Sequence, residues 1–490
     1  MMGMQEPPQS SLFYVGINID KRVRANHPLR RTRELIDFDF SYDEVKDRYG
    51  TKGNVSVPPP VILKLMLLLV LYNVRSEREL MDTLPERLDW LWFLDYDLDS
   101  EIPNHSILSK ARKKWGVEIF QSFFERIVLQ CVEAGMINGK KIFVDSSLID
   151  ANASNNSVLD TKSLKHQLHK NYKKLESRLE DREGSSDPSR KYEKKNNRYI
   201  SSTDPDAAII NRGKPKLSYQ VHRAVEGQSE IITATDATPG DVNEAHLMIQ
   251  LLEQHKKNTS VTAGTIVADS KYGTIDNFLA CHDRGTQAHI PDLRKVSDKR
   301  FRKLNIFNED RFQYDPEKDI YNCPAGNVLK PKTLHKNRQS RDYAAPKKVC
   351  ASCQIREKCT RNKSGRTVKR HLRQSELDVM REASRSYKAK QDIKTRQHLM
   401  ERSFARSTRY DFDRARWRGL WRMRIQEYLT CAIQNIQVLI KHVVKPTKSI
   451  AVIDMTVKTL FMKTVSPLVQ AISGTFYGLR YHEAFPIQRI

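Results

Sequence analysis

The chain has 490 residues and carries 84 Lys and Arg against 59 Asp and Glu, a formal net charge of +25. This length predicts two to four domains, and so basic a surface favours a polyanionic partner, with nucleic acid the first choice. The best apolar run, 61–72, contains Lys64 and falls well short of the roughly 20 residues that a membrane helix needs. Residues 1–16 lack the features of a signal peptide, so we expect an intracellular protein with reduced cysteines and no membrane partner.

Residues 1–137 are predicted to form an all-α N-terminal domain. A nearly continuous apolar segment, 61–74, follows three prolines, which the first turn of a helix tolerates. A break at 102–106 precedes a basic helix that carries Lys110, Arg112, Lys113 and Lys114. Such a helix suits contact with a DNA backbone, although a solvated charged face explains the pattern equally well.

From residue 138 the pattern changes to strands. Residues 141–144 predict a strand that ends at Asp145, whereas 155–200 predict a charged insert with an amphipathic helix. Residues 217–225 and 231–234 predict a hairpin, followed by a helix after Gly240, a strand over 264–269, a helix over 275–282 and a strand over 287–290. This order predicts an α/β fold over 138–300, with a mixed sheet flanked by helices.

A basic insert, 301–380, carries four of the seven cysteines: Cys323, Cys350, Cys353 and Cys359. Four thiolates around a C-x₂-C core are typical of a closed, structural Zn²⁺ site, which would help to fold an insert with few apolar residues. Unrelated free cysteines are the alternative. Cys131, Cys281 and Cys431 lie among apolar residues and are expected in the core.

Helices are predicted to resume over 381–445, ending in the long helix 420–444, and 446–490 are read as a C-terminal tail. Three acids stand out: Asp145 and Asp269 follow apolar strands, and Glu401 lies in this helical region. Two divalent ions held by a few carboxylates can activate a nucleophile and stabilise a leaving oxygen, which phosphodiester cleavage requires. Placement alone leaves equally open the reading that these acids are ordinary turn or cap residues.

Several motifs carry a resemblance to a known family: the segments 143–147, 150–154, 202–207, 219–222 and 267–273, the residues Tyr387, Arg396, Glu401 and Arg409, and the run 414–420. In these motifs the chain resembles DDE transposases of bacterial insertion sequences. The resemblance implies an RNase H-like core in which Asp145, Asp269 and Glu401 bind two Mg²⁺ or Mn²⁺ ions. Asp150 and Asp236 rank below this triad. The chain departs from the family at Ser407-Thr408, where a basic residue is usual, and at Lys271, where a small residue is usual; Arg406 or Arg409 would then supply the missing charge.

The resemblance further implies a metal-dependent endonuclease and strand transferase, which cleaves element ends and joins the freed 3′ hydroxyl to target DNA. Its partner would be double-stranded DNA, bound by a homodimer or larger assembly in the bacterial cytoplasm and associated with the nucleoid. DNA contacts are expected from the N-terminal helices, from 294–302 and 330–341, and from Arg396, Arg409, Arg414, Arg416, Trp417 and Arg418; for Trp417, core packing remains equally open. The alternatives are a catalytically inactive, transposase-derived DNA-binding protein and a general nuclease.

Overall fold

The computed structural model describes residues 2–4, 18–50, 54–160, 199–292, 301 and 303–444. The chain divides into two units, 1–436 and 437–490, and the elements below belong to the first unit except for the C-terminal end of the last helix. Most of the predicted insert 155–200, most of the basic run 294–302 and all of the predicted tail 446–490 lie outside the described residues.

The N-terminal region is helical, as predicted. Its helices are α1 (Ile19–Arg22), α2 (Pro28–Leu35), α3 (Phe40–Val45), α4 (Pro59–Leu71), α5 (Glu77–Thr83), α6 (Leu88–Leu94), α7 (Ser106–Trp115) and α8 (Glu118–Glu133). Helix α4 is buried from Pro59 to Val70, so its apolar run forms the centre of this region. The one lysine in that run, Lys64, pairs with Asp95 at 2.8 Å, which compensates its burial.

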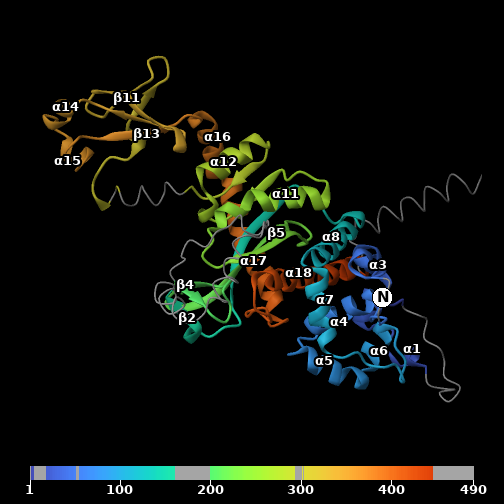
Figure 1. The fold of residues 1–490 in the computed structure, drawn as a ribbon. Helices are drawn as coiled ribbons and strands as arrows, with labels where there is room; N and C mark the ends of the chain where they lie inside the picture. The colour runs from blue at the N-terminus through green and yellow to red at the C-terminus, as the bar shows by residue number, and fades with distance from the viewer. Residues whose placement is uncertain are drawn as a thin grey trace, which may run out of the picture. The chain divides into compact units, whose positions relative to one another are not determined.

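The central sheet is mixed, which confirms the predicted fold class at this level. Its strands are β1 (Lys141–Asp150), β4 (Ala208–Arg212), β5 (Lys214–Glu226), β6 (Ile232–Pro239), β7 (Thr265–Val267) and β8 (Gln287–His289). Antiparallel β5 and parallel β7 flank β1, and β8 continues the parallel side while β6 and β4 pair with β5 (Figure 1). The β5–β6 pairing is the predicted hairpin.

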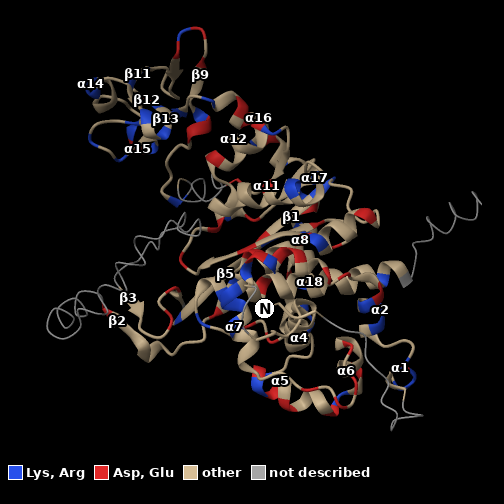
Figure 2. Cartoon of the chain, turned by 45° about the vertical axis from the view of Figure 1, so that its right-hand side comes forward, with Lys and Arg blue, Asp and Glu red and all other residues tan. Residues whose placement is uncertain are grey.

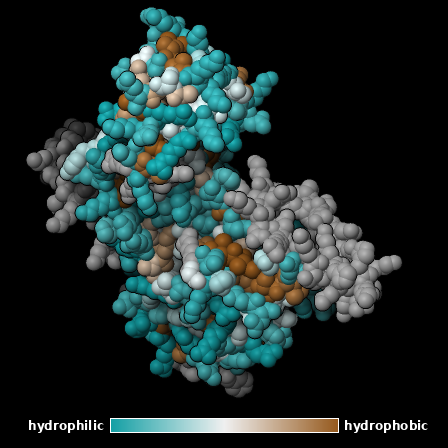
Figure 3. Space-filling model, turned by 90° about the vertical axis from the view of Figure 1, so that its left-hand side faces the viewer, coloured by the Kyte–Doolittle hydropathy of each residue, from teal (hydrophilic) through white to brown (hydrophobic). Residues whose placement is uncertain are grey.

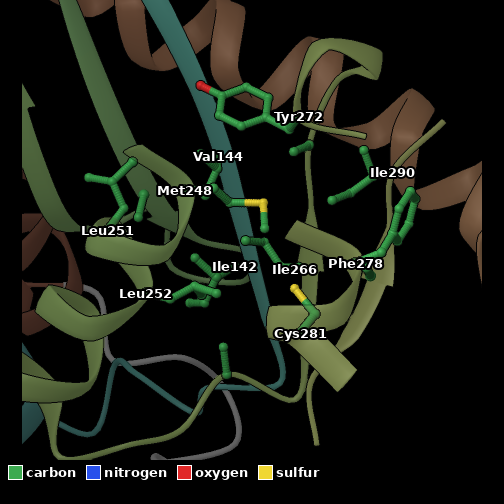
Figure 4. Close-up of a cluster of buried hydrophobic side chains, with 14 of the residues drawn as sticks. Ile142, Val144, Met248, Leu251, Leu252, Ile266, Tyr272, Phe278, Cys281 and Ile290 are labelled. Atoms are coloured by element: carbon green, nitrogen blue, oxygen red, sulfur yellow. The ribbon is translucent and has the colours of Figure 1, made fainter. Parts of the chain in front are cut away.

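Helices α11 (Met248–Thr259) and α12 (Ile275–Asp283) cover one face of this sheet through an apolar core. Ile142 and Val144 of β1 and Ile266 of β7 pack with Met248 and Leu251, among others (Figure 4). Because side chains alternate along a strand, Phe143 and Asp145 point to the opposite face.

On that opposite face, α17 (Tyr387–Thr408) packs against β1, β7 and β8. It follows α16 (Gln374–Arg385), which begins before residue 381, where helices were predicted to resume. The last helix, α18 (Leu420–Val444), has the bounds predicted from its apolar spacing. The buried guanidinium of Arg223 joins β5 to both long helices, through Ser407 of α17 at 2.9 Å and Glu427 of α18 at 2.6 Å.

Residues 313–371 form a second sheet that carries the cysteine cluster. Its strands are β9 (Gln313–Asp315), β10 (Ile320–Asn322), β11 (Val328–His335), β12 (Ser340–Ala344) and β13 (Thr367–His371), paired in the order β13-β12-β11-β10-β9. The short helices α14 (Lys347–Ala351) and α15 (Arg356–Cys359) connect β12 to β13. A small core of Phe312, Tyr321, Leu329, Tyr343 and Val368 holds the sheet together.

The prediction that a strand ends at Asp145 is wrong. Strand β1 runs on to Asp150, because β5 pairs with it residue by residue as far as Ser218. Ser146 and Ser147 interrupt the apolar run but are compatible with a strand whose far end is only partly buried. Asp145 therefore lies inside a strand and has neighbours on both sides.

Among the described residues, no helix combines the length and apolar character needed to cross a membrane. On the face shown in Figure 3, hydrophilic residues cover most of the described surface and hydrophobic ones gather in smaller patches.

Candidate metal and DNA site

Asp145 and Asp269 lie next to each other because β1 and β7 are parallel neighbours. Phe143 pairs with Val267, so Asp145 and Asp269 each follow that pair by two residues. Asp269 caps a short 3₁₀ turn (Ser270–Tyr272) and accepts a hydrogen bond from the backbone N–H of Lys271 at 2.8 Å. The structure thus brings together the first two acids that the sequence singled out.

The carboxyl group of Asp145 has a raised pKa, mainly because it is largely buried. The Asp269 carboxylate raises it further, whereas Arg396, whose Nη1 lies 2.5 Å from Oδ2, and the backbone N–H of Ser146 lower it. A divalent cation would stabilise the charged form of such a carboxyl group beside a second carboxylate. Arg396 therefore lies in the site itself and acts as the counter-ion of Asp145.

Among the described residues, no hydrogen bond connects Glu401 to Asp145 or Asp269. Its side chain is exposed and accepts a hydrogen bond from Gln397 at 3.2 Å. At 3.6 residues per turn, Glu401 lies about 140° around α17 from Arg396, away from the buried residues Met400 and Ser403. Within the described ranges, the one group of three possible ligands with atoms inside 4.8 Å is His282, Asp283 and Glu376, on the surface. Arg373 bonds both carboxylates of that group, so their charge is already compensated.

The departure at Ser407 has a structural reason. Ser407 is buried and contacts Arg223 at 2.9 Å and Gln434 at 2.6 Å, so a lysine there would place a second cation beside Arg223. Of the two proposed replacements, Arg406 pairs with Glu230 at 2.6 Å, whereas Arg409 is exposed at the end of α17.

Several predicted DNA-binding residues make contacts within the protein. Arg416 donates to the backbone oxygen of Val74 at 2.6 Å and so ties the segment before α18 to the N-terminal region. Trp417 is stacked under Arg112, at 4.0 Å from the guanidinium carbon to the ring centroid. Arg112 itself is buried and bonds Glu77, so it does not belong to a DNA-facing surface of α7. Arg418 donates to the backbone oxygen of Asn152 at 3.0 Å, and Arg414 is exposed.

Sequence reasoning missed one acid at this site, Glu244. It lies in a 3₁₀ turn (Glu244–Leu247) just before α11, is buried, and contacts both Ser146 and Lys271. Its position after the Pro239-Gly240 turn carries no signal of this role, since only the tertiary fold brings it beside the aspartates.

The four cysteines of the insert gather around one pocket, as the spacing predicts for a single site. Cys323, Cys350, Cys353 and Cys359 all line it, and all are free and partly buried. Burial raises the pKa of Cys359, and the three other thiols act in the same direction, so the four groups are close. Such a set fits a cation that stabilises thiolates.

Two models of known families match separate parts of the chain: a transposase domain, DUF772, over residues 17–114, and a transposase DDE domain over residues 322–440. Together the two matches support a DDE transposase of the insertion-sequence type. The DDE match includes the cysteine cluster and Glu401, whereas Asp145, Asp269 and Glu244 lie between the two matches, so their assignment depends on geometry. No curated protein matches the chain significantly.

Proposed function

We propose that this transposase cleaves the ends of an insertion sequence and joins them to target DNA at one site built on Asp145 and Asp269. The observation that carries the proposal is the parallel pairing of β1 and β7, which places both carboxylates together in a chain with transposase matches on either side. The strand arrangement is also the one expected of an RNase H-like core: β1 has antiparallel β5 on one side, followed by β6, and parallel β7 on the other, followed by β8.

The donor set fits Mg²⁺ or Mn²⁺, which prefer hard oxygen ligands. Asp145 and Asp269 would hold the ions, with Glu401 proposed as the third ligand from α17. When bound, such ions lower the pKa of an attacking water and stabilise the charge on the leaving oxygen. Glu401 must then change its partner from Gln397, which predicts that α17 or its side chains rearrange on metal or DNA binding.

The proposed reaction needs no covalent intermediate between the protein and the DNA. A water oxygen bonds to phosphorus while the phosphorus–3′-oxygen bond breaks, which leaves a 3′ hydroxyl on the element end. That hydroxyl then attacks a target phosphate, and the target's own 3′ oxygen leaves. Arg396 bonds Asp145. If a metal ion took the place of Arg396 beside Asp145, the Arg396 guanidinium would be available to bind a DNA phosphate.

The DNA surface is proposed to include the β11–β12 hairpin. Four exposed basic residues lie on it, and no described contact gives any of them a carboxylate partner: Lys330, Lys332, Lys336 and Arg338. A two-stranded ribbon fits the major groove, and each phosphate contact adds to the salt dependence of binding. Figure 2 shows that Lys and Arg also occur along several other elements, interspersed with Asp and Glu. Lys110 and Lys113 of α7 and the exposed Arg409 and Arg414 are the other proposed contacts.

We further propose that Zn²⁺ bound by the four cysteines stabilises the sheet that carries this hairpin. The protein would act in the bacterial cytoplasm, on double-stranded DNA, as a dimer or larger assembly, since joining two ends requires at least two active sites.

The function is tested by strand transfer. A duplex that carries the terminal sequence with a preformed 3′ hydroxyl is mixed with a plasmid, Mg²⁺ and either the wild type or Asp145→Asn. Only the wild type should produce joined products, while both bind the duplex. Joining by Asp145→Asn would refute the assignment, and cutting of random duplex without joining would favour a general nuclease. Binding by both proteins without any product would favour an inactive DNA-binding relic.

A further inference from the structure

The carboxylate of Glu244 connects the two strand segments that carry the site aspartates. It accepts hydrogen bonds from the hydroxyl of Ser146 and, at 3.3 Å, from the amide of Gln220, and it pairs with the ammonium of Lys271. Ser146 directly follows Asp145, and Lys271 follows Asp269 by two residues. One buried side chain thus holds both segments at once.

Glu244 reaches the site from the face of the sheet opposite to α17. Ser146 alternates with Asp145 along β1, so its hydroxyl points toward the α11 side, where Gln220 also bonds it at 2.7 Å. The glutamate is buried, and burying a carboxylate is costly unless it is paired and hydrogen-bonded. Two of its three observed partners, Ser146 and Lys271, lie within two residues of Asp145 and Asp269, so most of the pairing that offsets this cost is made next to the site.

Lys271 is the exposed end of this network. Its side chain is 53% exposed, whereas that of Glu244 is 7% exposed, so the Lys271–Glu244 pair reaches solvent through the lysine. An ammonium has three donors and binds phosphate as a point charge. Burial raises the pKa of the Tyr272 hydroxyl most, and the charges of Glu244, Asp145 and Asp269 raise it further, so all three carboxylates lie near this hydroxyl.

We propose that Glu244 is a positioning residue of the transposase site, which fixes the Asp145 and Asp269 segments relative to each other and directs Lys271 toward the phosphate backbone of bound DNA. The inference depends on the proposed function, because it assigns roles around the same metal site. This role also explains why the chain has Lys271 where the family usually has a small residue, because Glu244 is the counter-ion of that lysine.

The test uses the full chain with Glu244→Gln, Lys271→Gln and the control Glu253→Gln, which removes an exposed partner of Arg284 at 2.7 Å. Mn²⁺ affinity is measured by calorimetry without DNA, and duplex affinity is measured in chelator over a range of salt. Glu244→Gln should weaken Mn²⁺ binding about tenfold, as loss of an outer partner of metal ligands typically does. Lys271→Gln should weaken duplex binding and reduce the salt slope by about one. The control should change neither.

Unaltered Mn²⁺ affinity in Glu244→Gln, or an unaltered salt slope in Lys271→Gln, would overturn the inference while leaving the proposed function standing. Absence of Mn²⁺ binding by the wild type would overturn the metal site itself and this role with it. If Glu244→Gln does not fold, Ser146→Ala becomes the decisive variant, since it removes one bond to Glu244; it should also weaken Mn²⁺ binding, and unchanged affinity would overturn the inference.

Discussion

Removing the charge of Glu427 should cost more stability than almost any other isosteric change in this chain. Arg223 and Glu427 are both essentially unexposed, and their two hydrogen bonds measure 2.6 and 2.9 Å. The same carboxylate accepts from Thr235 at 2.6 Å. In Glu427→Gln the Arg223 guanidinium would remain buried without a counter-charge.

Loss of one partner of a buried ion pair costs about 3–5 kcal/mol, which is a large share of the roughly 5–15 kcal/mol that stabilises a typical protein. Glu253→Gln, which breaks an exposed pair, should cost at most about 1 kcal/mol. Because Arg223 also contacts α17 at Ser403 and Ser407, the loss should weaken the packing of the helix that carries Arg396 and Glu401.

The assay is urea denaturation followed by circular dichroism, with the wild type, Glu427→Gln, Glu253→Gln and the double variant Arg223→Met/Glu427→Leu. The double variant should recover part of the lost stability, since no unpaired charge remains. A loss below about 1 kcal/mol in Glu427→Gln, equal to that of the control, would refute the argument that this pair is buried and essential.

Three further predictions concern the ions and charges of the site. Mn²⁺ at a hundred times its Kd should stabilise the wild type by about 2.7 kcal/mol and Asp145→Asn not at all, as thermal unfolding would show; equal stabilisation would exclude Asp145 as a ligand. Arg396→Gln should raise the pKa of Asp145 further, because Arg396 lowers it. A raised pKa of Asp145 means that the free energy of unfolding falls as pH rises from 3.8 through the pKa of the folded protein. In Arg396→Gln this pH-dependent loss of stability should be larger and extend to higher pH. It should be absent when Asp145→Asn is added. Cys353→Ser should lose the bound Zn²⁺ found by metal analysis, whereas Cys281→Ala should keep it; retained zinc in Cys353→Ser would refute the four-thiolate site.

Periodic features of the fold could be predicted from sequence. The β5–β6 hairpin follows from alternating apolar residues on either side of a glycine turn, and the bounds of α18 follow from its apolar spacing. The end of β1 could not be predicted, because the strand continues through two serines that only pairing with β5 keeps in register.

Charged residues were harder to assign, because composition does not show which charges are paired. Arg112 and Arg416 resemble DNA contacts in the sequence, yet one is buried against Glu77 and the other binds backbone oxygens far away in the chain. Strand order indicated that Asp145 and Asp269 could lie close together but left their role open until the family resemblance was considered, whereas Glu244 needed the tertiary structure.

The most direct test of the central claim is Mg²⁺-dependent cleavage of a duplex that carries the DNA flanking this gene, by the wild type and by Asp269→Ala, with binding measured in parallel. We predict that both proteins bind and that only the wild type cuts. Cutting by Asp269→Ala would contradict the site, and binding without cutting by either protein would show that this chain recognises DNA without acting on it.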